Sequence, residues 1–504
     1  MLYSLSLALP LLALPFGGLA AETVHGVVVF SRHGDRTSKF FPPTQLTALG
    51  QNQMYNSGAF YRSRYIDPNS ASHISGISAR EIVSSQLYAA APDQNLLVNS
   101  GQAFLQGLYP PLSSFSIQDP AETVTNGTAV TPPLSGYQYA TIHTVSSSDP
   151  STIWLKGDDG CPRKIQDSAS FFTSELYTRL EASTKNFYES FSDILGGLLT
   201  PSAMSYTSAY PIFDYINVGT IHNDTIAERV TPAELLQLRT LADSQQWALN
   251  GNIPSAKSLG ALPISGRTLA SKILMQLASI IDSGGKTNKF SLFLGSYDTF
   301  LSFFALSQLP NSDVNFFGLP DYGSTIAFEL ISYSSDATMP MNGNGLYVRF
   351  LFRNGTDDAA PLREYPIFGH ARADAVMLWA DFRDAMARVT VSSVSQWCGI
   401  CEATESFCPI SASSSTTNVQ NPHKKKTLTL AVAGVIGAIC ALAVVGVAMA
   451  FAMVFFGVRF AKSWRNTKRG GFNDGEKLGS TCDLQLRSST DKGGVQHPDK
   501  IFAQ

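Results

Sequence analysis

The chain has 504 residues, of which 44% are hydrophobic and 15% are charged, and its formal net charge at pH 7 is -3. A chain of this length and apolar content can bury a large core, and its composition excludes overall disorder. The small negative net charge provides no general basic field, so we do not expect nucleic acid as a partner.

The chain begins with an apolar stretch that ends in small residues, which is typical of a secretory signal peptide. We assign this signal to residues 1–20, with cleavage near Ala20 or Ala21. Residues 22–408 then form the predicted ectodomain, which lies outside the cytosol.

A short β-branched run, Val24–Phe30, leads directly into the motif Arg32-His33-Gly34-Asp35-Arg36-Thr37. The run predicts a buried parallel strand that delivers a loop at its carboxyl end, where open α/β sheets place their chemistry. In such a loop, Arg32 and Arg36 can hold a tetrahedral anion by forked hydrogen bonds while His33 attacks it. The alternative interpretation is a solvated basic turn with an incidental histidine.

The motif after a hydrophobic strand resembles the signature of the histidine acid phosphatases, the branch of the histidine phosphatase superfamily that includes secreted acid phosphatases and phytases. The resemblance continues through residues 46–51, 61–65 and 104–111 and extends to about Cys408. It implies an α/β fold with a core like that of the phosphoglycerate mutases and a helical insert. We also expect a helix from about Leu46 to Tyr65 on the strength of this resemblance.

The same resemblance implies a role for each residue of the motif. His33 becomes phosphorylated, Arg32 and Arg36 bind phosphate, and Asp298 protonates the leaving group. The expected partner is a small phosphorylated substrate, and no cofactor is implied.

Two positions depart from the family pattern. The family has a third phosphate-binding arginine where the aligned stretch here has Leu96, and a His-Asp pair where this chain has Tyr297 and Asp298. The hydroxyl of Tyr297 could still offer a neutral donor to the anion. A charge-assisted hydrogen bond contributes about 1.5 to 3 kcal/mol. Losing two phosphate ligands therefore removes roughly 3 to 6 kcal/mol of transition-state stabilisation, which corresponds to a rate lower by about two to four powers of ten.

Periodic apolar residues predict most of the remaining elements. A helical insert is expected from about 162 to 265, and the turn that carries Tyr297 and Asp298 follows a second strand. The predicted elements are helices at 166–199, 232–247 and 269–281, a strand at 290–294, a helix to 309, strands at 326–332 and 347–352, and a helix at 371–388.

Four of the six cysteines lie in the predicted ectodomain, namely Cys161, Cys398, Cys401 and Cys408. An even number in an oxidising compartment favours two disulfides, which leaves three possible pairings. We favour Cys161 joined to one of the carboxyl-terminal three, with the other two closing a local loop. The Cys398-x-x-Cys401 spacing lacks a second pair or a His cluster, so we expect no metal site.

Three sequons, at Asn126, Asn223 and Asn354, fall on the predicted outer side and are candidate glycosylation sites. The ectodomain is followed by a Ser/Thr-rich stalk at 409–426.

Residues 427–458 contain no charged residue and form one predicted transmembrane helix. A buried helix in a soluble core is the alternative, but the run is too long and has charges on both sides. The larger basic cluster follows the span, so the ectodomain should lie outside and the tail, 459–504, in the cytosol. The tail is rich in Gly, Ser, Lys and Asp, and we expect it to be disordered.

Two hypotheses follow from these observations. The first is a membrane-anchored, extracytoplasmic histidine acid phosphatase that hydrolyses phosphate monoesters through a phosphohistidine, with weakened phosphate binding. The second is a degenerate relative that binds an anionic ligand or acts as a cell-surface interaction protein. The intact motif favours the first hypothesis, whereas Leu96 and Tyr297 favour the second.

Overall fold

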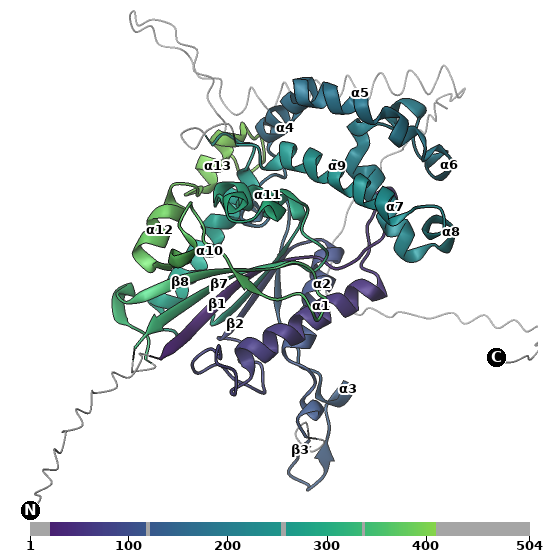
Figure 1. Ribbon diagram of the computed structural model, residues 1–504. Coiled ribbons are helices and arrows are strands. Elements are labelled where there is room, and N and C mark those ends of the chain that lie inside the picture. Colours follow the sequence, from purple (N-terminus) through teal and green to yellow (C-terminus); the bar gives the residue numbers. More distant parts are fainter. Residues whose placement is uncertain (1–20, 117–120, 254–258, 335–337, 410–504) are drawn as a thin grey trace, which may run out of the picture. The chain divides into compact units, whose positions relative to one another are not determined.

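The computed structural model describes residues 21–116, 121–253, 259–334 and 338–409 (Figure 1). The predicted signal peptide, membrane span and tail lie outside these residues, as does the stalk from residue 410 on. Among the helices that the structure describes, none is long and apolar enough to cross a bilayer.

A mixed β-sheet lies at the centre of the fold, as expected for the α/β class. The described strands are β1 (Glu22–Arg32), β2 (Leu87–Pro92), β5 (Ile142–Val145), β6 (Phe290–Gly295), β7 (Thr325–Tyr333), β8 (Leu346–Arg353), β9 (Arg363–Glu364) and β10 (Val376–Leu378), with a separate hairpin of β3 (Glu122–Thr123) and β4 (Ala129–Val130). The order in the sheet is β10-β8-β7-β1-β6-β2-β5, and β9 pairs with β8.

The four strands β1, β6, β2 and β5 are parallel, whereas β7, β8 and β10 pair in antiparallel fashion. The sequence predicts β1 as a buried parallel strand. The strand is buried, but its pairing is parallel only with β6. On its other side β1 pairs with the antiparallel β7. The carboxyl ends of β1, β2 and β6 and the beginning of β7 therefore meet at one edge of the sheet.

Helices cover both faces of the sheet, as Figure 1 shows, because β1 is apolar in both directions. Val27 and Val29 pack in the core cluster with helices α1 and α2, whereas Val28 and Phe30 pack in the cluster with α10, α11 and α12. These helices are α1 (Ala48–Tyr61), α2 (Asn95–Leu108), α10 (Ile264–Asp282), α11 (Tyr297–Leu306) and α12 (Trp379–Ala387).

A run of helices between β5 and α10 forms the insert, which lies beside α11 in Figure 1. Its members are α4 (Pro162–Ala169), α5 (Glu175–Glu189), α6 (Ser192–Leu195), α7 (Ala209–His222), α8 (Asp224–Ala227) and α9 (Pro232–Asn250). Sequence periodicity does not single out α7, because apolar residues such as Ile212, Phe213 and Ile216 leave it without a clean polar face.

The helices expected within 166–199 correspond to α4, α5 and α6, and Ser174 begins α5 by accepting a hydrogen bond from the Tyr177 amide. One predicted helix differs from the observed element. The helix expected at 371–388 is shorter, because residues 376–378 form β10 and extend the antiparallel side of the sheet. A short helix after α12, α13 (Val394–Cys401), and the four-residue α3 (Pro133–Gly136) are also present.

The four cysteines among the described residues form two disulfides. Cys161 at the start of the insert is bonded to Cys401, and Cys398 is bonded to Cys408. This is the arrangement that the sequence favours, and it ties the insert to α13.

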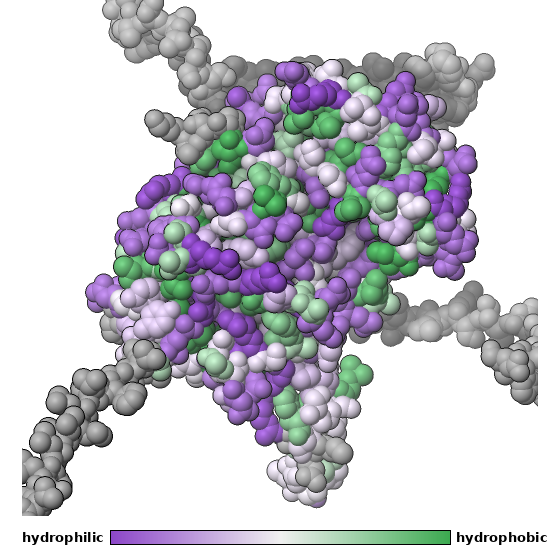
Figure 2. Space-filling view, in the orientation of Figure 1, coloured by the Kyte–Doolittle hydropathy of each residue, from purple (hydrophilic) through white to green (hydrophobic). Residues whose placement is uncertain are grey.

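The outer surface on the side drawn in Figure 2 carries hydrophilic residues with small hydrophobic groups between them. Single exposed apolar residues of this kind are normal on a surface that faces water.

Candidate active site

The Arg32–Thr37 motif forms the turn that leaves β1 at the edge where the strand ends meet. Arg32 lies opposite Gly295 in the parallel register. The Arg32 amide donates to the Ser324 carbonyl at 2.9 Å, and the Gly323 amide donates to the His33 carbonyl at 3.0 Å. The turn is thus held between the end of β6 and the segment that enters β7.

Gly34 and Asp35 fix the shape of this turn. A Cβ atom on Gly34 would lie 2.4 Å from the Gly50 carbonyl oxygen, so only glycine allows α1 to approach this closely. The fully buried Asp35 carboxylate accepts hydrogen bonds from the Thr47 hydroxyl at 2.5 Å and from Nε2 of His222 at 2.6 Å. His222 ends α7, so Asp35 links the turn to both α1 and the insert.

His33 is held as a neutral imidazole with one defined tautomer. It is 3% exposed, and its Nδ1 lies 2.8 Å from the carbonyl oxygen of Gly34. Because a carbonyl only accepts, Nδ1 must carry the proton and Nε2 keeps its lone pair. Burial, followed by the charges of Arg32 and Arg36, lowers the pKa of His33 well below its usual range. The ring therefore remains an unprotonated nucleophile under mildly acidic conditions.

Arg32 lies beside His33 between two tyrosine rings. Its guanidinium carbon is 4.4 Å from the centre of the Tyr322 ring and 5.5 Å from that of Tyr297. One terminal nitrogen donates to the carbonyl of Pro320, whereas Nε is buried and has no acceptor among the described residues. Arg32 thus keeps donor capacity that an anion could use.

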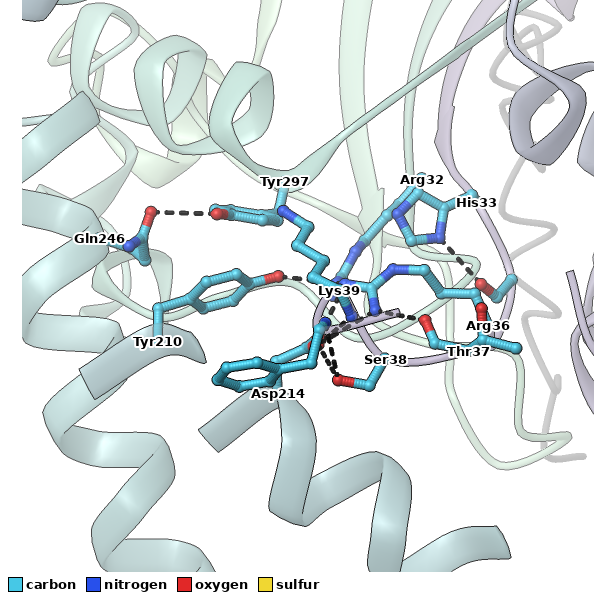
Figure 3. Close-up of polar contacts among 12 residues, drawn as sticks. Arg32, His33, Arg36, Thr37, Ser38, Lys39, Tyr210, Asp214, Gln246 and Tyr297 are labelled. Atoms are coloured by element: carbon cyan, nitrogen blue, oxygen red, sulfur yellow. Dashed lines mark hydrogen bonds and ion pairs between the residues drawn. The ribbon is translucent and has the colours of Figure 1, made fainter. Parts of the chain in front are cut away.

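Arg36 already holds an anion, the side chain of Asp214 on α7, as Figure 3 shows. Its two terminal nitrogens donate to the two carboxylate oxygens at 2.7 and 3.2 Å. The same carboxylate also accepts from the Ser38 hydroxyl at 3.2 Å and from the Lys39 amide at 3.0 Å. Asp214 therefore occupies the fork that the sequence assigns to phosphate.

A further cation, Lys39, reaches toward Tyr297 in Figure 3. Although the residue as a whole is exposed, its ammonium lies 4.9 Å from the centre of the Tyr210 ring and 5.0 Å from that of Tyr297. Burial of the ammonium, followed by the charge of Arg36, lowers its pKa to about 8. The group is therefore charged at neutral and acidic pH.

Tyr297 lies in the site, but its hydroxyl already has an acceptor. The hydroxyl donates to Oε1 of Gln246 at 3.1 Å, and the ring packs 4.7 Å from that of Tyr210. Burial raises the pKa of Tyr297 well above its usual value, so the phenol stays neutral. The role of Tyr297 as a donor to an anion remains a prediction.

Leu96 and Asp298 also lie at this edge of the sheet. Leu96 is 8% exposed in the first turn of α2, and its carbonyl accepts from the Ser100 hydroxyl, which in turn accepts from the Gly34 amide at 3.4 Å. Leu96 therefore lies one helical turn before Ser100, the residue of α2 that contacts the motif at Gly34. Asp298 lies in the first turn of α11, and its buried Oδ1 has no hydrogen-bond donor among the described residues.

Sequence reasoning missed several residues of the site. Asp214, Tyr210 and Tyr322 come from distant segments with no local signal of chemistry, and only the folded insert brings the first two to Arg36. Lys39 follows the motif closely and could have been included as a nearby cation. Among the described residues, no group of three His, Cys, Asp or Glu side chains is placed to hold a metal ion.

Two of the three predicted glycosylation sites lie close to the motif turn, because Asn223 follows His222 and Asn354 accepts a hydrogen bond from Ser324. Asn126, Asn223 and Asn354 are all exposed. Asn223 caps α8, and the Asn354 amide nitrogen donates to Asp321 at 3.1 Å.

The cavity at the site is small. Its volume is about 220 Å³, and Arg32, Tyr210, Asp214, Tyr322 and Arg239 contribute to its walls. Ligand pockets usually enclose about 300 to 1,000 Å³. The space is therefore suited to a small anion. A second cavity of about 1550 Å³ lies along the insert and shares only Arg239 and residues 319–320 with the first.

Comparisons with known proteins place this geometry in a family context. The profile of the histidine phosphatase superfamily (branch 2) matches residues 42–353, more than half of the chain, beginning just after the motif. Prostatic acid phosphatase from Bos taurus is 25% identical over 369 residues, which cover 70% of this chain and 83% of that protein. The prostatic acid phosphatase of Homo sapiens is 26% identical over 299 residues, with coverages of 56% and 68%.

Solved structures with the same fold include two bacterial phytases. The phytase from Citrobacter braakii matches with a TM-score of 0.51 at 14% identity and covers 75% of this chain and 99% of its own. Hafnia alvei phytase in complex with tartrate has a TM-score of 0.50 at 15% identity, with coverages of 74% and 99%. At these identities the two matches show a shared fold.

Replacing Asp214 tests whether an internal carboxylate competes with phosphate. In Asp214→Asn the side-chain shape is kept but the charge opposite Arg36 is removed, so inorganic phosphate should bind about 10 to 100 times more tightly, corresponding to one or two charge-assisted hydrogen bonds. Isothermal titration calorimetry measures this affinity without requiring turnover. A thermal melt should show a loss of stability, because a buried guanidinium loses its counter-ion.

The matched control for this prediction is Asp193→Asn, which removes an exposed carboxylate paired with Arg229 at 3.3 Å on the surface. It should leave phosphate affinity unchanged. A folded Asp214→Asn protein with equal or weaker phosphate affinity would show that Asp214 does not compete for the Arg36 fork.

Proposed function

The chain belongs to the histidine phosphatase superfamily (branch 2), and from this membership we propose that it hydrolyses phosphate monoesters through a phosphohistidine on His33. One observation carries the proposal: Nε2 of a neutral His33 keeps its lone pair beside the guanidiniums of Arg32 and Arg36. A nucleophile with a flanking cationic cradle is the arrangement that phosphoryl transfer requires.

The proposed reaction uses the site residues in two steps. The phosphoryl group takes the place of Asp214 on Arg36 and uses the free Nε of Arg32, while Nε2 of His33 attacks phosphorus in line with the leaving oxygen. Asp298 supplies the proton to that oxygen. Water then attacks the phosphohistidine and releases inorganic phosphate, which regenerates the neutral imidazole.

Three features of the site support small substrates and modest rates. The cavity of about 220 Å³ has room for a phosphoryl group with a small organic part. Leu96 replaces a cationic ligand of the family pattern, and Tyr297 replaces an imidazole. Lys39 compensates in part, because its ammonium lies against the Tyr297 ring and contributes positive charge at acidic pH.

We further propose that the enzyme is anchored to a membrane with its ectodomain outside the cytosol. The uncharged run at 427–458, the amino-terminal signal and the basic cluster after the span support this orientation. The Cys161–Cys401 and Cys398–Cys408 disulfides suit an oxidising compartment.

The internal ion pair between Arg36 and Asp214 favours a second function. A family member whose cradle is filled by its own carboxylate could serve as an anion-binding or cell-surface interaction protein without turnover. Leu96 and Tyr297 point in the same direction. Direct detection of a covalent phosphoenzyme separates the two functions.

The first test of this proposal is to trap the intermediate. Brief exposure to a radiolabelled aryl phosphate, followed by denaturation, should leave acid-labile, base-stable label on the wild-type protein and none on His33→Ala. Because burial and the flanking arginines lower the pKa of His33 well below its usual value of 6.5, labelling should not fall as the pH is lowered through 6.5. His370→Ala, which changes an exposed loop histidine, is the control and should label normally. Label retained in His33→Ala would place the nucleophile elsewhere.

A second test addresses orientation. Protease added to intact cells should remove the ectodomain and leave a small membrane-protected fragment that carries the tail, because residues 459–504 are expected in the cytosol. Immunoblotting with an antibody against the tail detects this fragment. An ectodomain cleaved only after permeabilisation, in protein labelled at the cell surface, would contradict the orientation.

A further inference from the structure

The helix α7 holds the motif turn at two points. Near the middle of the helix, Asp214 accepts two hydrogen bonds from Arg36, the shorter at 2.7 Å. At its last residue, Nε2 of His222 donates to Oδ2 of Asp35 at 2.6 Å. Asp35 and Arg36 are neighbours in the chain, so one helix of the insert binds two adjacent side chains of opposite charge in the turn that carries the proposed nucleophile.

The Asp35 carboxylate has few donors, and His222 is one of them. The carboxylate is fully buried, and its Oδ2 accepts from the Thr47 hydroxyl at 2.5 Å as well as from His222. Its Oδ1 is also buried and has no donor among the described residues. A carboxylate without hydration depends on the donors that it has. Thr47 caps α1, so His222 is the donor that comes from the insert.

His222 reaches Asp35 from the surface of the protein. The side chain of His222 is 37% exposed, whereas that of Asp35 is 0% exposed. The ring is therefore not part of the hydrophobic core, and burial of apolar area does not explain its place. The feature that distinguishes it is the hydrogen bond to a buried carboxylate of the motif.

The other hydrogen bonds between α7 and the turn involve Arg36 or Asp214. Arg36 donates to Asp214 and, at 3.4 Å, to the Tyr210 hydroxyl. The two residues after Thr37 donate to Asp214 as well. Among the described residues, the His222 contact is thus the one hydrogen bond from α7 to the turn that involves neither Arg36 nor Asp214.

This difference matters once a phosphate group binds. In the proposed reaction the phosphoryl group takes the place of Asp214 on Arg36, which opens the hold at the middle of α7. The contact of His222 with Asp35 can persist, because it uses no atom of the phosphate cradle. The turn is then held to the insert through His222.

We propose that His222 is a positioning residue that keeps the motif turn docked on α7 after phosphate has displaced Asp214 from Arg36. This inference rests on the phosphate-binding step of the proposed function and extends it to a residue outside the motif. Loss of the His222 donor should cost more stability in the phosphate-bound protein than in the free protein, because Asp214 still holds the turn in the free protein.

The affinity for inorganic phosphate tests the proposal in the full chain without turnover. Isothermal titration calorimetry should show about tenfold weaker binding for His222→Ala, the equivalent of one charge-assisted hydrogen bond. His222→Gln should restore most of the affinity, because its side-chain amide can still donate to the carboxylate. Asp224→Asn is the matched control, since it changes an exposed carboxylate two residues away, and it should leave the affinity unchanged.

Combining His222→Ala with Asp214→Asn separates positioning from general stabilisation. In Asp214→Asn the charge that holds the turn in the free protein is already missing, so loss of the His222 donor affects the free and the bound protein more equally. The decrease in phosphate affinity caused by His222→Ala should therefore shrink from about tenfold to about twofold in this background. The decrease in melting temperature without phosphate should grow.

A merely structural role of His222 would lower the melting temperature equally in both backgrounds and leave phosphate affinity unchanged, and that result would overturn the proposal. Equal losses of affinity in His222→Gln and His222→Ala would also overturn it, because the donor would then be irrelevant. If His222→Ala does not fold, His222→Phe takes its place with the same expectations, since it keeps a ring of similar size without a donor.

Hydrolysis of phosphate esters is measured separately on the same proteins. Wild-type protein that binds phosphate with the expected dependence on His222 but hydrolyses no ester would overturn the proposed function and leave the positioning role standing. An active enzyme whose phosphate affinity is the same in all His222 variants would overturn the positioning role alone. Wild-type protein that binds no phosphate would overturn both.

Discussion

The site depends on the parallel pairing of β1 with β6. Their register places Arg32 opposite Gly295, so the motif turn and the start of α11 leave the sheet side by side. A slip of one residue would turn every side chain of β1 to the other face and separate His33 from Asp298. The register is fixed by burial on both faces, since Val27 and Val29 pack on one side and Val28 and Phe30 on the other.

The buried positive charges of the site need a negative charge nearby, and a side chain of the protein itself supplies it. Arg36 is fully buried, and an unpaired guanidinium at this depth would cost several kcal/mol. Asp214 neutralises it through two hydrogen bonds and fixes the loop through Ser38 and Lys39. The same contact that stabilises the empty site opposes the entry of a phosphoryl group. Under the proposed function, we therefore expect weak phosphate binding from the Arg36–Asp214 pair, in addition to the effect of the two substitutions visible in the sequence.

Much of the architecture could be predicted from the sequence. Short apolar strands, the insert as a helical region and the Cys161 link to the carboxyl-terminal cysteines all leave local signals in composition or spacing. The polar side chains that contact the motif from distant segments leave no such local signal in the sequence. The contact of Asp214 with Arg36 forms only when the insert folds back on the sheet, and α7 is apolar on most sides, so its one acidic side chain is not distinguishable in advance. The sequence therefore predicted the groups that we propose to attack and to bind phosphate, but not the Asp214 carboxylate that holds Arg36.

The central claim is that Nε2 of His33 accepts a phosphoryl group held by Arg32 and by an Arg36 released from Asp214. A crystal structure of the protein with orthovanadate, which adopts the geometry of phosphorus during transfer, tests this claim most directly. The account predicts vanadium bonded to Nε2 of His33, with its oxygens on both guanidiniums and the Asp214 carboxylate displaced. Vanadate bound elsewhere, with the pair between Arg36 and Asp214 intact, would contradict it.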